Sequence, residues 1–86
     1  MQHFDACANL DDLTDDPAVL RQWAMLLRDG FRRYGMSEKT CDSLCQYARN
    51  KAEAITERLH GRVERALRIE AWNQRLYKDL PVQWRW

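Results

Sequence analysis

The stretch DPAVLRQWAMLLRDGFRRYGMS, residues 16–37, decides the fold because it holds a helix start, a helix body and a helix end in order. Asp16 before Pro17 is typical of an N-cap followed by the first helical position. Gly35 stands where a helix commonly ends in the left-handed conformation. Between them, apolar residues recur at spacings of four and three, which places them on one helix face: Leu20, Ala24, Leu27, Phe31 and Tyr34. We therefore predict a helix over residues 17–34.

A second apolar stripe begins after the two-residue turn at 35–36, where Ser37 is the expected N-cap. Its members again alternate spacings of four and three: Cys41, Cys45, Ala48, Ala52, Ile55 and Leu59, and the same spacing continues through Arg62, Ala66, Ile69, Asn73 and Leu76. The pattern favours one long helix over residues 38–78, continuous or gently kinked. The alternative is a break at His60-Gly61, because a glycine inside a helix costs about 1 kcal/mol relative to alanine. Either way the fold class is all-α, a helical hairpin.

The two ends of the chain lack this periodicity. We expect an irregular acidic lead over residues 1–15 and a short aromatic tail over residues 79–86, which starts close to Pro81. The net charge is +1 over the 86 residues. The acidic side chains are concentrated early, since the first 20 residues hold five aspartates and no lysine or arginine. The basic remainder permits contact with an acidic partner.

Composition bounds the class of protein. A chain of 86 residues, 45% hydrophobic and 31% charged, suits one small folded domain over residues 1–86. No stretch has the length and apolarity of a membrane span, so we expect no membrane association. The three cysteines are an odd number without a disulfide spacing. These observations predict a cytoplasmic protein with reduced thiols, and small chains of this kind are common among bacterial and phage accessory proteins.

A protein-binding surface is expected on the C-terminal half. If the second helix runs unbroken, the shorter first helix cannot cover it, and the apolar stripe there stays open. Exposed apolar patches commonly mark interfaces, and tryptophan and arginine are enriched at their centres. Self-association as a homodimer, in the manner of a coiled coil, is the simplest way to cover the stripe. The residues expected to form the contact are Arg65, Arg68, Ile69, Trp72, Leu76, Tyr77, Trp84 and Trp86.

An alternative function is DNA binding. Residues 26–44, LLRDGFRRYGMSEKTCDSL, resemble the Gly-apolar-Ser-x-x-Thr-apolar segment of bacterial helix-turn-helix proteins. The resemblance implies that outward-facing residues of the Ser37-capped helix approach base edges: Lys39, Thr40, Asp42 and Ser43. It implies phosphate contacts from Arg32, Arg33 and Arg49. Phe31 departs from the motif, which has a small residue four positions before the glycine, and a plain turn between antiparallel helices explains the same residues.

Enzymatic chemistry has little support. The chain has no glycine-rich phosphate loop, no His-Glu-x-x-His pair and no nucleophile elbow. Cys41 and Cys45 lie one turn apart, yet a structural zinc site needs about four ligands, so we expect both thiols in the core and neither a metal nor a cofactor. We therefore expect a non-enzymatic protein-binding module, a small adaptor or modulator acting as a homodimer. The alternative is a DNA-binding regulator.

Overall fold

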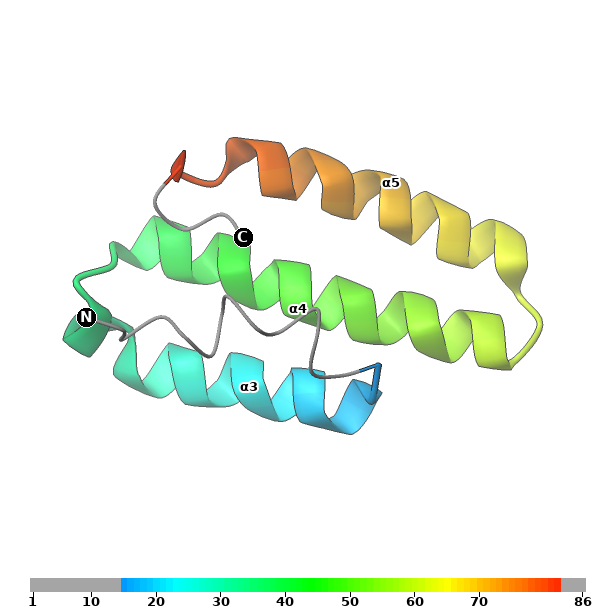
Figure 1. Ribbon diagram of the computed structural model, residues 1–86, viewed down its shortest axis with the longest axis horizontal. Coiled ribbons are helices and arrows are strands. Elements are labelled where there is room, and N and C mark those ends of the chain that lie inside the picture. Colours follow the sequence, from blue (N-terminus) through cyan, green and yellow to red (C-terminus); the bar gives the residue numbers. More distant parts are fainter. Residues whose placement is uncertain (1–14, 83–86) are drawn as a thin grey trace.

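A computed structural model of the chain describes residues 15–82, and all of its regular structure in that range is helical (Figure 1). Helix α3 spans Pro17–Gly30 and continues as a 3₁₀ segment, η1, over Phe31–Tyr34. Helix α4 spans Glu38–Leu59, and helix α5 spans Val63–Asp79. The all-α prediction is confirmed. The first predicted helix, 17–34, is helical throughout, but its α-helical part ends at Gly30.

Both helix starts predicted from capping residues are confirmed. The Asp16 carboxylate accepts a hydrogen bond from the backbone N–H of Ala18 at 2.9 Å, with Pro17 at the first helical position. The Ser37 hydroxyl accepts from the backbone N–H of Thr40 at 3.1 Å. Each side chain satisfies a donor that the first turn of a helix leaves without an intrahelical acceptor.

The predicted long helix over residues 38–78 is wrong, and the alternative break at His60-Gly61 is confirmed. Gly61 has φ +79°, a left-handed conformation that glycine adopts without steric cost. The N–H of Arg62 donates to the carbonyl of Glu57 at 2.8 Å, and the N–H of Gly61 donates to the carbonyl of Arg58 at 3.0 Å. This pair of hydrogen bonds is a Schellman motif, which closes the end of α4 and turns the chain back.

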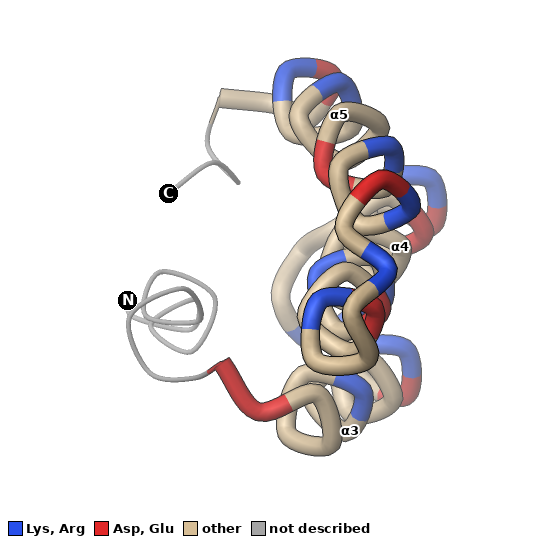
Figure 2. Tube along the Cα trace, turned by 90° about the vertical axis from the view of Figure 1, so that its right-hand side faces the viewer, with Lys and Arg blue, Asp and Glu red and all other residues tan. Residues whose placement is uncertain are grey.

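The helices form one layer in which α4 lies between α3 and α5, each antiparallel to it (Figure 1). The stripe of α4 that faces α3 contains Ala48 and Ala52, both fully buried. Small residues there allow close approach of α3, whose Trp23 packs against the same core together with Phe31 of η1. Seen along the helices, most charged residues of α4 and α5 lie on one side of the layer (Figure 2).

A second face of α4, the one that packs against α5, is also buried, and the apolar pattern did not predict it. Asn50, Ala54 and Glu57 leave 7% or less of their surface exposed. Because α5 folds back onto this face, Ala66 and Leu80 are buried as well. The open apolar surface expected on the C-terminal half is therefore smaller than an unbroken helix would leave.

Candidate functional site

One flank of α5 holds five of the residues predicted to bind a partner. Four of these five, together with Asp79, which was not predicted, lie in a row at spacings of four, three, four and three. We call this row the α5 seam: Arg65, Ile69, Trp72, Leu76 and Asp79. Trp72 leaves 47% of its surface exposed, while Ile69 and Leu76 are half-buried. Arg68 is exposed beside the seam. An exposed tryptophan between two aliphatic side chains, with arginines nearby, has the composition of a protein contact.

Ion pairs at the α4–α5 turn anchor the start of the α5 seam. The guanidinium of Arg62 donates two hydrogen bonds to the Glu57 carboxylate, at 2.5 and 3.0 Å. Arg65 approaches the same carboxylate at 3.4 Å and that of Glu53 at 3.7 Å. The hydrogen bonds from Arg62, aided by the charges of Arg62 and Arg65, lower the pKa of Glu57. The interleaved acids and bases of the sequence therefore join two helices.

A second bridge between α4 and α5 lies at Arg58 and Glu70. The guanidinium donates to both carboxylate oxygens, at 2.9 and 2.8 Å. These hydrogen bonds lower the pKa of Glu70 and raise that of Arg58. Two-pronged arginine–carboxylate contacts restrict geometry as well as adding energy, so they fix how α5 is rotated on α4.

Buried amides complete the contact between these helices. Asn73, at a position of the predicted apolar stripe, is 8% exposed and donates from Nδ2 to the carbonyl of Tyr47 at 3.0 Å. The side chain of Asn50 accepts from Gln46 at 2.9 Å. Among residues 15–82, Asn73 Oδ1 and Asn50 Nδ2 are buried without a hydrogen-bond partner. Such groups lower stability, because they have lost their water without replacing it.

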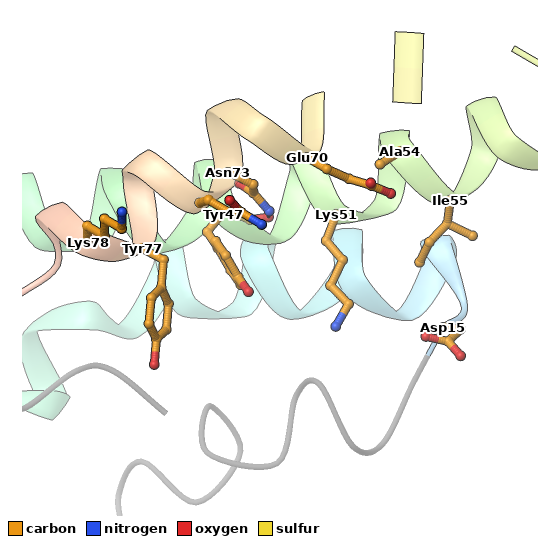
Figure 3. Close-up of a pocket in the computed structure, with 10 residues that line it drawn as sticks. Asp15, Tyr47, Lys51, Ala54, Ile55, Glu70, Asn73, Tyr77 and Lys78 are labelled. Carbon is orange, nitrogen blue, oxygen red and sulfur yellow. The ribbon is translucent and has the colours of Figure 1, made fainter. Parts of the chain in front are cut away.

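A groove of about 670 Å³ runs along α4 and α5 (Figure 3). Its walls include the Tyr47 and Tyr77 rings, whose centroids are 6.0 Å apart. Charged residues of both signs line it: Asp15, Lys51, Glu70 and Lys78. Because of this mixture, charge selects neither an anionic nor a cationic ligand.

Tyr77 lies apart from the predicted contact residues of the α5 seam. It lines the groove, which also receives Gln74 of α5. At 3.6 residues per turn, Trp72 lies about 160° around the helix from Gln74, so the α5 seam and the groove are on different sides of α5. The remaining two predicted residues, Trp84 and Trp86, lie outside the described residues.

The predicted DNA-contacting residues do not all face outward. Thr40 is only 8% exposed and its hydroxyl is 3.0 Å from that of Ser37, so its expected approach to base edges is wrong. Asp42 is exposed but forms an ion pair with Arg28 of α3, and Ser43 is half-buried. The basic residues of the set are exposed: Arg32, Arg33, Lys39 and Arg49.

The arrangement of α3 and α4 also differs from the resemblance. They lie side by side and antiparallel (Figure 1), whereas the two helices of a DNA-binding helix-turn-helix cross at about 90–120°. Phe31, the departure from the motif, packs against the shared core. The alternative explanation of these residues, a turn between antiparallel helices, agrees with this geometry.

The two neighbouring thiols are part of the core, as predicted. Cys41 and Cys45 are almost fully buried, with their sulfur atoms 3.8 Å apart. Cys45 Sγ donates to the carbonyl of Ala24 at 3.3 Å. Burial, together with the adjacent Cys41, raises the pKa of Cys45 to about 12. A thiol held protonated in this way is a poor nucleophile and a poor metal ligand.

The same range of the chain offers no cluster of metal ligands and no membrane span. Within residues 15–82, no three His, Cys, Asp or Glu side chains are grouped as a metal site would require. No helix of that range is long and apolar enough to cross a bilayer.

Exposed apolar residues also lie away from the α5 seam. On α3, Met25 and Leu26 leave more than 60% of their surfaces exposed. Near the α4–α5 turn, Leu59, Val63 and Leu67 are exposed to between 46% and 76%. Leu59 belongs to the predicted apolar stripe, but it is the last residue of α4, beyond the part that α3 covers. The exposure of Leu59 depends on where α3 and α4 end, which the apolar pattern does not determine.

Compared with known protein families, curated proteins and solved structures, the chain has no match. Its function must therefore be inferred from its own surfaces.

Proposed function

We propose that this chain is a non-enzymatic protein-binding module, a small helical adaptor or modulator that acts through the α5 seam and self-associates as a homodimer. The observation that carries the proposal is Trp72, which is 47% exposed at the middle of the seam. Ile69 and Leu76 flank it along the helix, and Arg68 lies beside it. Interface hot spots combine an aromatic anchor with surrounding aliphatic and arginine side chains in this way.

The attachment of α5 to α4 also supports the proposal. The Arg58–Glu70 and Arg62–Glu57 bridges and the buried Asn73 hold α5 at several points along its length. A surface that is already ordered loses little conformational entropy on binding. The α5 seam is thus a preorganised contact face.

A photo-crosslinker tests the proposal for a partner of any identity. Trp72 is replaced by p-benzoylphenylalanine in the full chain, which is then irradiated in its host cells. A matched control carries the same group at Arg49, an exposed position on α4. We expect discrete protein adducts from position 72 that are missing from position 49. Equal adducts from both positions, or none from position 72, would contradict a contact at the α5 seam.

The alternative function, a DNA-binding regulator, rests on the exposed basic residues at and after the α3–α4 turn. Arg32 and Arg33 of η1 and Lys39 of α4 are all exposed there. Fluorescence anisotropy of a labelled random duplex, at low and at physiological salt, tests it. Binding that weakens steeply with salt, and that Arg32→Ala and Arg33→Ala reduce for every duplex, would support DNA binding. No binding at low salt would remove it.

A further inference from the structure

The charges of the α5 seam specify which partner and which orientation fit it. Along the seam the order is basic, aliphatic, aromatic, aliphatic and acidic, from Arg65 to Asp79. Trp72 is one residue from the midpoint of α5, which spans Val63–Asp79. A row with an apolar centre and opposite charges at its two ends is complementary to the same row reversed.

We propose that the α5 seam pairs with the α5 seam of a second copy, antiparallel, about a two-fold axis at Trp72. This inference rests on the proposed function and adds the orientation and register of the contact. In an antiparallel pair centred on residue 72, facing positions have numbers that sum to about 144. Trp72 then meets its own symmetry mate, Ile69 faces Leu76, and Arg65 faces Asp79. A two-fold contact of this kind is isologous, so every contact occurs twice.

The parallel alternative is disfavoured by the same residues. A parallel pair in register places Arg65 against Arg65 and Asp79 against Asp79, so that both ends repel. The antiparallel pair places opposite charges at both ends. Asp79 is exposed, and the Arg65 side chain remains 62% exposed beside its α4 carboxylates, so both can be reached from outside the chain. Electrostatic complementarity therefore selects the orientation.

The size of the contact sets the expected strength. From residue 65 to residue 79 the seam runs about 21 Å, at 1.5 Å per residue. One helix pair of this length falls at the low end of specific interfaces, below about 1,200 Å² of total buried surface. We therefore expect a weak, reversible dimer whose monomer is also folded.

Charge exchange tests the register. Sedimentation velocity over a range of concentrations is measured for the full chain, for Arg65→Asp, for Asp79→Arg and for the double variant. Each single reversal turns both end pairs repulsive, and we expect about tenfold weaker dimerisation from two exposed pairs worth up to about 1 kcal/mol each. Because Arg65→Asp also removes the contacts with Glu57 and Glu53, the circular dichroism and urea midpoints of Arg65→Asp and the double variant are compared with those of the original chain. The double variant restores both end pairs, so at concentrations where it is folded its dissociation constant should return close to that of the original chain.

Two controls keep the result interpretable. In this register Arg68 faces Leu76 and Arg75 of the second copy, both about as far from the two-fold axis, so Arg68→Asp removes a like-charge contact and should not weaken the dimer as Asp79→Arg does. Asp79→Arg leaves the α4–α5 ion pairs in place and puts a cation in the last turn of α5, where the helix dipole favours it. Its circular dichroism spectrum should therefore match that of the original chain.

The outcomes separate this inference from the proposed function. A dimer that Trp72→Ala weakens but that the double variant does not rescue would overturn the antiparallel register and leave the α5 seam as the contact. A chain that stays monomeric up to its solubility limit would overturn self-pairing. The crosslinks from position 72 would then decide whether the seam binds a different protein.

Discussion

Replacement of Gly61 by alanine examines the turn that folds α5 back onto α4. With φ +79°, Gly61 occupies a conformation that costs an L-residue roughly 1–2 kcal/mol. Apart from Gly61 itself and its two chain neighbours, no atom of the described residues lies within 4 Å of an added Cβ, so the cost is one of backbone conformation and not of a clash. Alanine also lowers the conformational entropy of the unfolded chain, which stabilises the folded state by about 0.4–1 kcal/mol. The expected net loss is about 1 kcal/mol.

Urea unfolding followed by circular dichroism measures this loss. With a slope of about 1 kcal/mol per molar urea for a small domain, the midpoint of Gly61→Ala should fall by about 1 M. Gly61→Asn should fall less, because asparagine tolerates the left-handed region. Gly30→Ala is the matched control. Gly30 has a negative φ and its added Cβ would lie 4.0 Å from Arg33 Cδ, so its midpoint should stay the same or rise.

The opposite result would refute the turn. If residues 38–78 form one helix, Gly61 is a helix-interior glycine, and alanine there is more favourable by about 1 kcal/mol. A Gly61→Ala variant that is more stable, with a stronger helical signal, would therefore show that the chain continues through this position. For Gly61→Ala, a turn thus predicts a lower free energy of unfolding, whereas a continuous helix predicts a higher one.

Three further predictions concern the interior and the α4–α5 bridges. Folding lowers the pKa values of Glu57 and Glu70. The ionised carboxylates therefore contribute their full stabilisation above the ordinary carboxyl pKa, near pH 4.3, and this stabilisation is lost as the pH falls through the lowered pKa values. Urea midpoints should thus fall on acidification, and Glu57→Gln with Glu70→Gln should flatten that dependence; an unchanged slope would count against the bridges. Asn73→Leu should stabilise the fold by about 1 kcal/mol, since it removes the unpaired Oδ1, whereas a loss of more than about 1 kcal/mol would mean that the hydrogen bond to Tyr47 outweighs the cost of that buried oxygen. Finally, iodoacetamide should modify Cys45 far more slowly in the native chain than in urea at pH 8, as followed by mass spectrometry of its peptide, and equal rates would disprove its burial.

Local signals made the starts of α3 and α4 predictable. The Asp16-Pro17 pair and Ser37 act through hydrogen bonds and steric effects within a few residues, so their consequences can be derived without a tertiary structure. The apolar stripe of α3 was equally informative, because Leu20, Ala24 and Leu27 all face α4 and are buried.

The break at Gly61 could not be derived from the apolar pattern. A stripe that passes from Ile55 to Ile69 suits an unbroken helix, and it also suits two helices folded against each other. The choice depends on the Schellman hydrogen bonds and on packing between α4 and α5, which only the folded chain provides. The second buried face of α4 was hidden for a related reason: Asn50 and Glu57 are polar, and their burial depends on groups of other segments.

The candidate site was predicted in part. Trp72 and its neighbours at helical spacing lie on one flank, because helix periodicity alone determines that grouping. Tyr77 follows Trp72 by five residues, which places it about 140° around the helix axis from Trp72. Its side chain therefore lines the groove instead of the α5 seam. Thr40 was misplaced because its hydroxyl is drawn into the cap at Ser37 instead of facing solvent.

Hydroxyl-radical footprinting of the full chain tests the central claim, contact through the α5 seam, most directly. Trypsin releases residues 69–75 as one peptide whose only aromatic residue is Trp72, and fragmentation of the peptide assigns the added oxygen to this side chain. We predict that oxidation of this peptide falls as protein concentration rises, while oxidation of Met25, which is 63% exposed on α3, stays constant. Oxidation of Trp72 that remains at its dilute level at every concentration, both for the pure protein and in host extract, would contradict contact through the α5 seam.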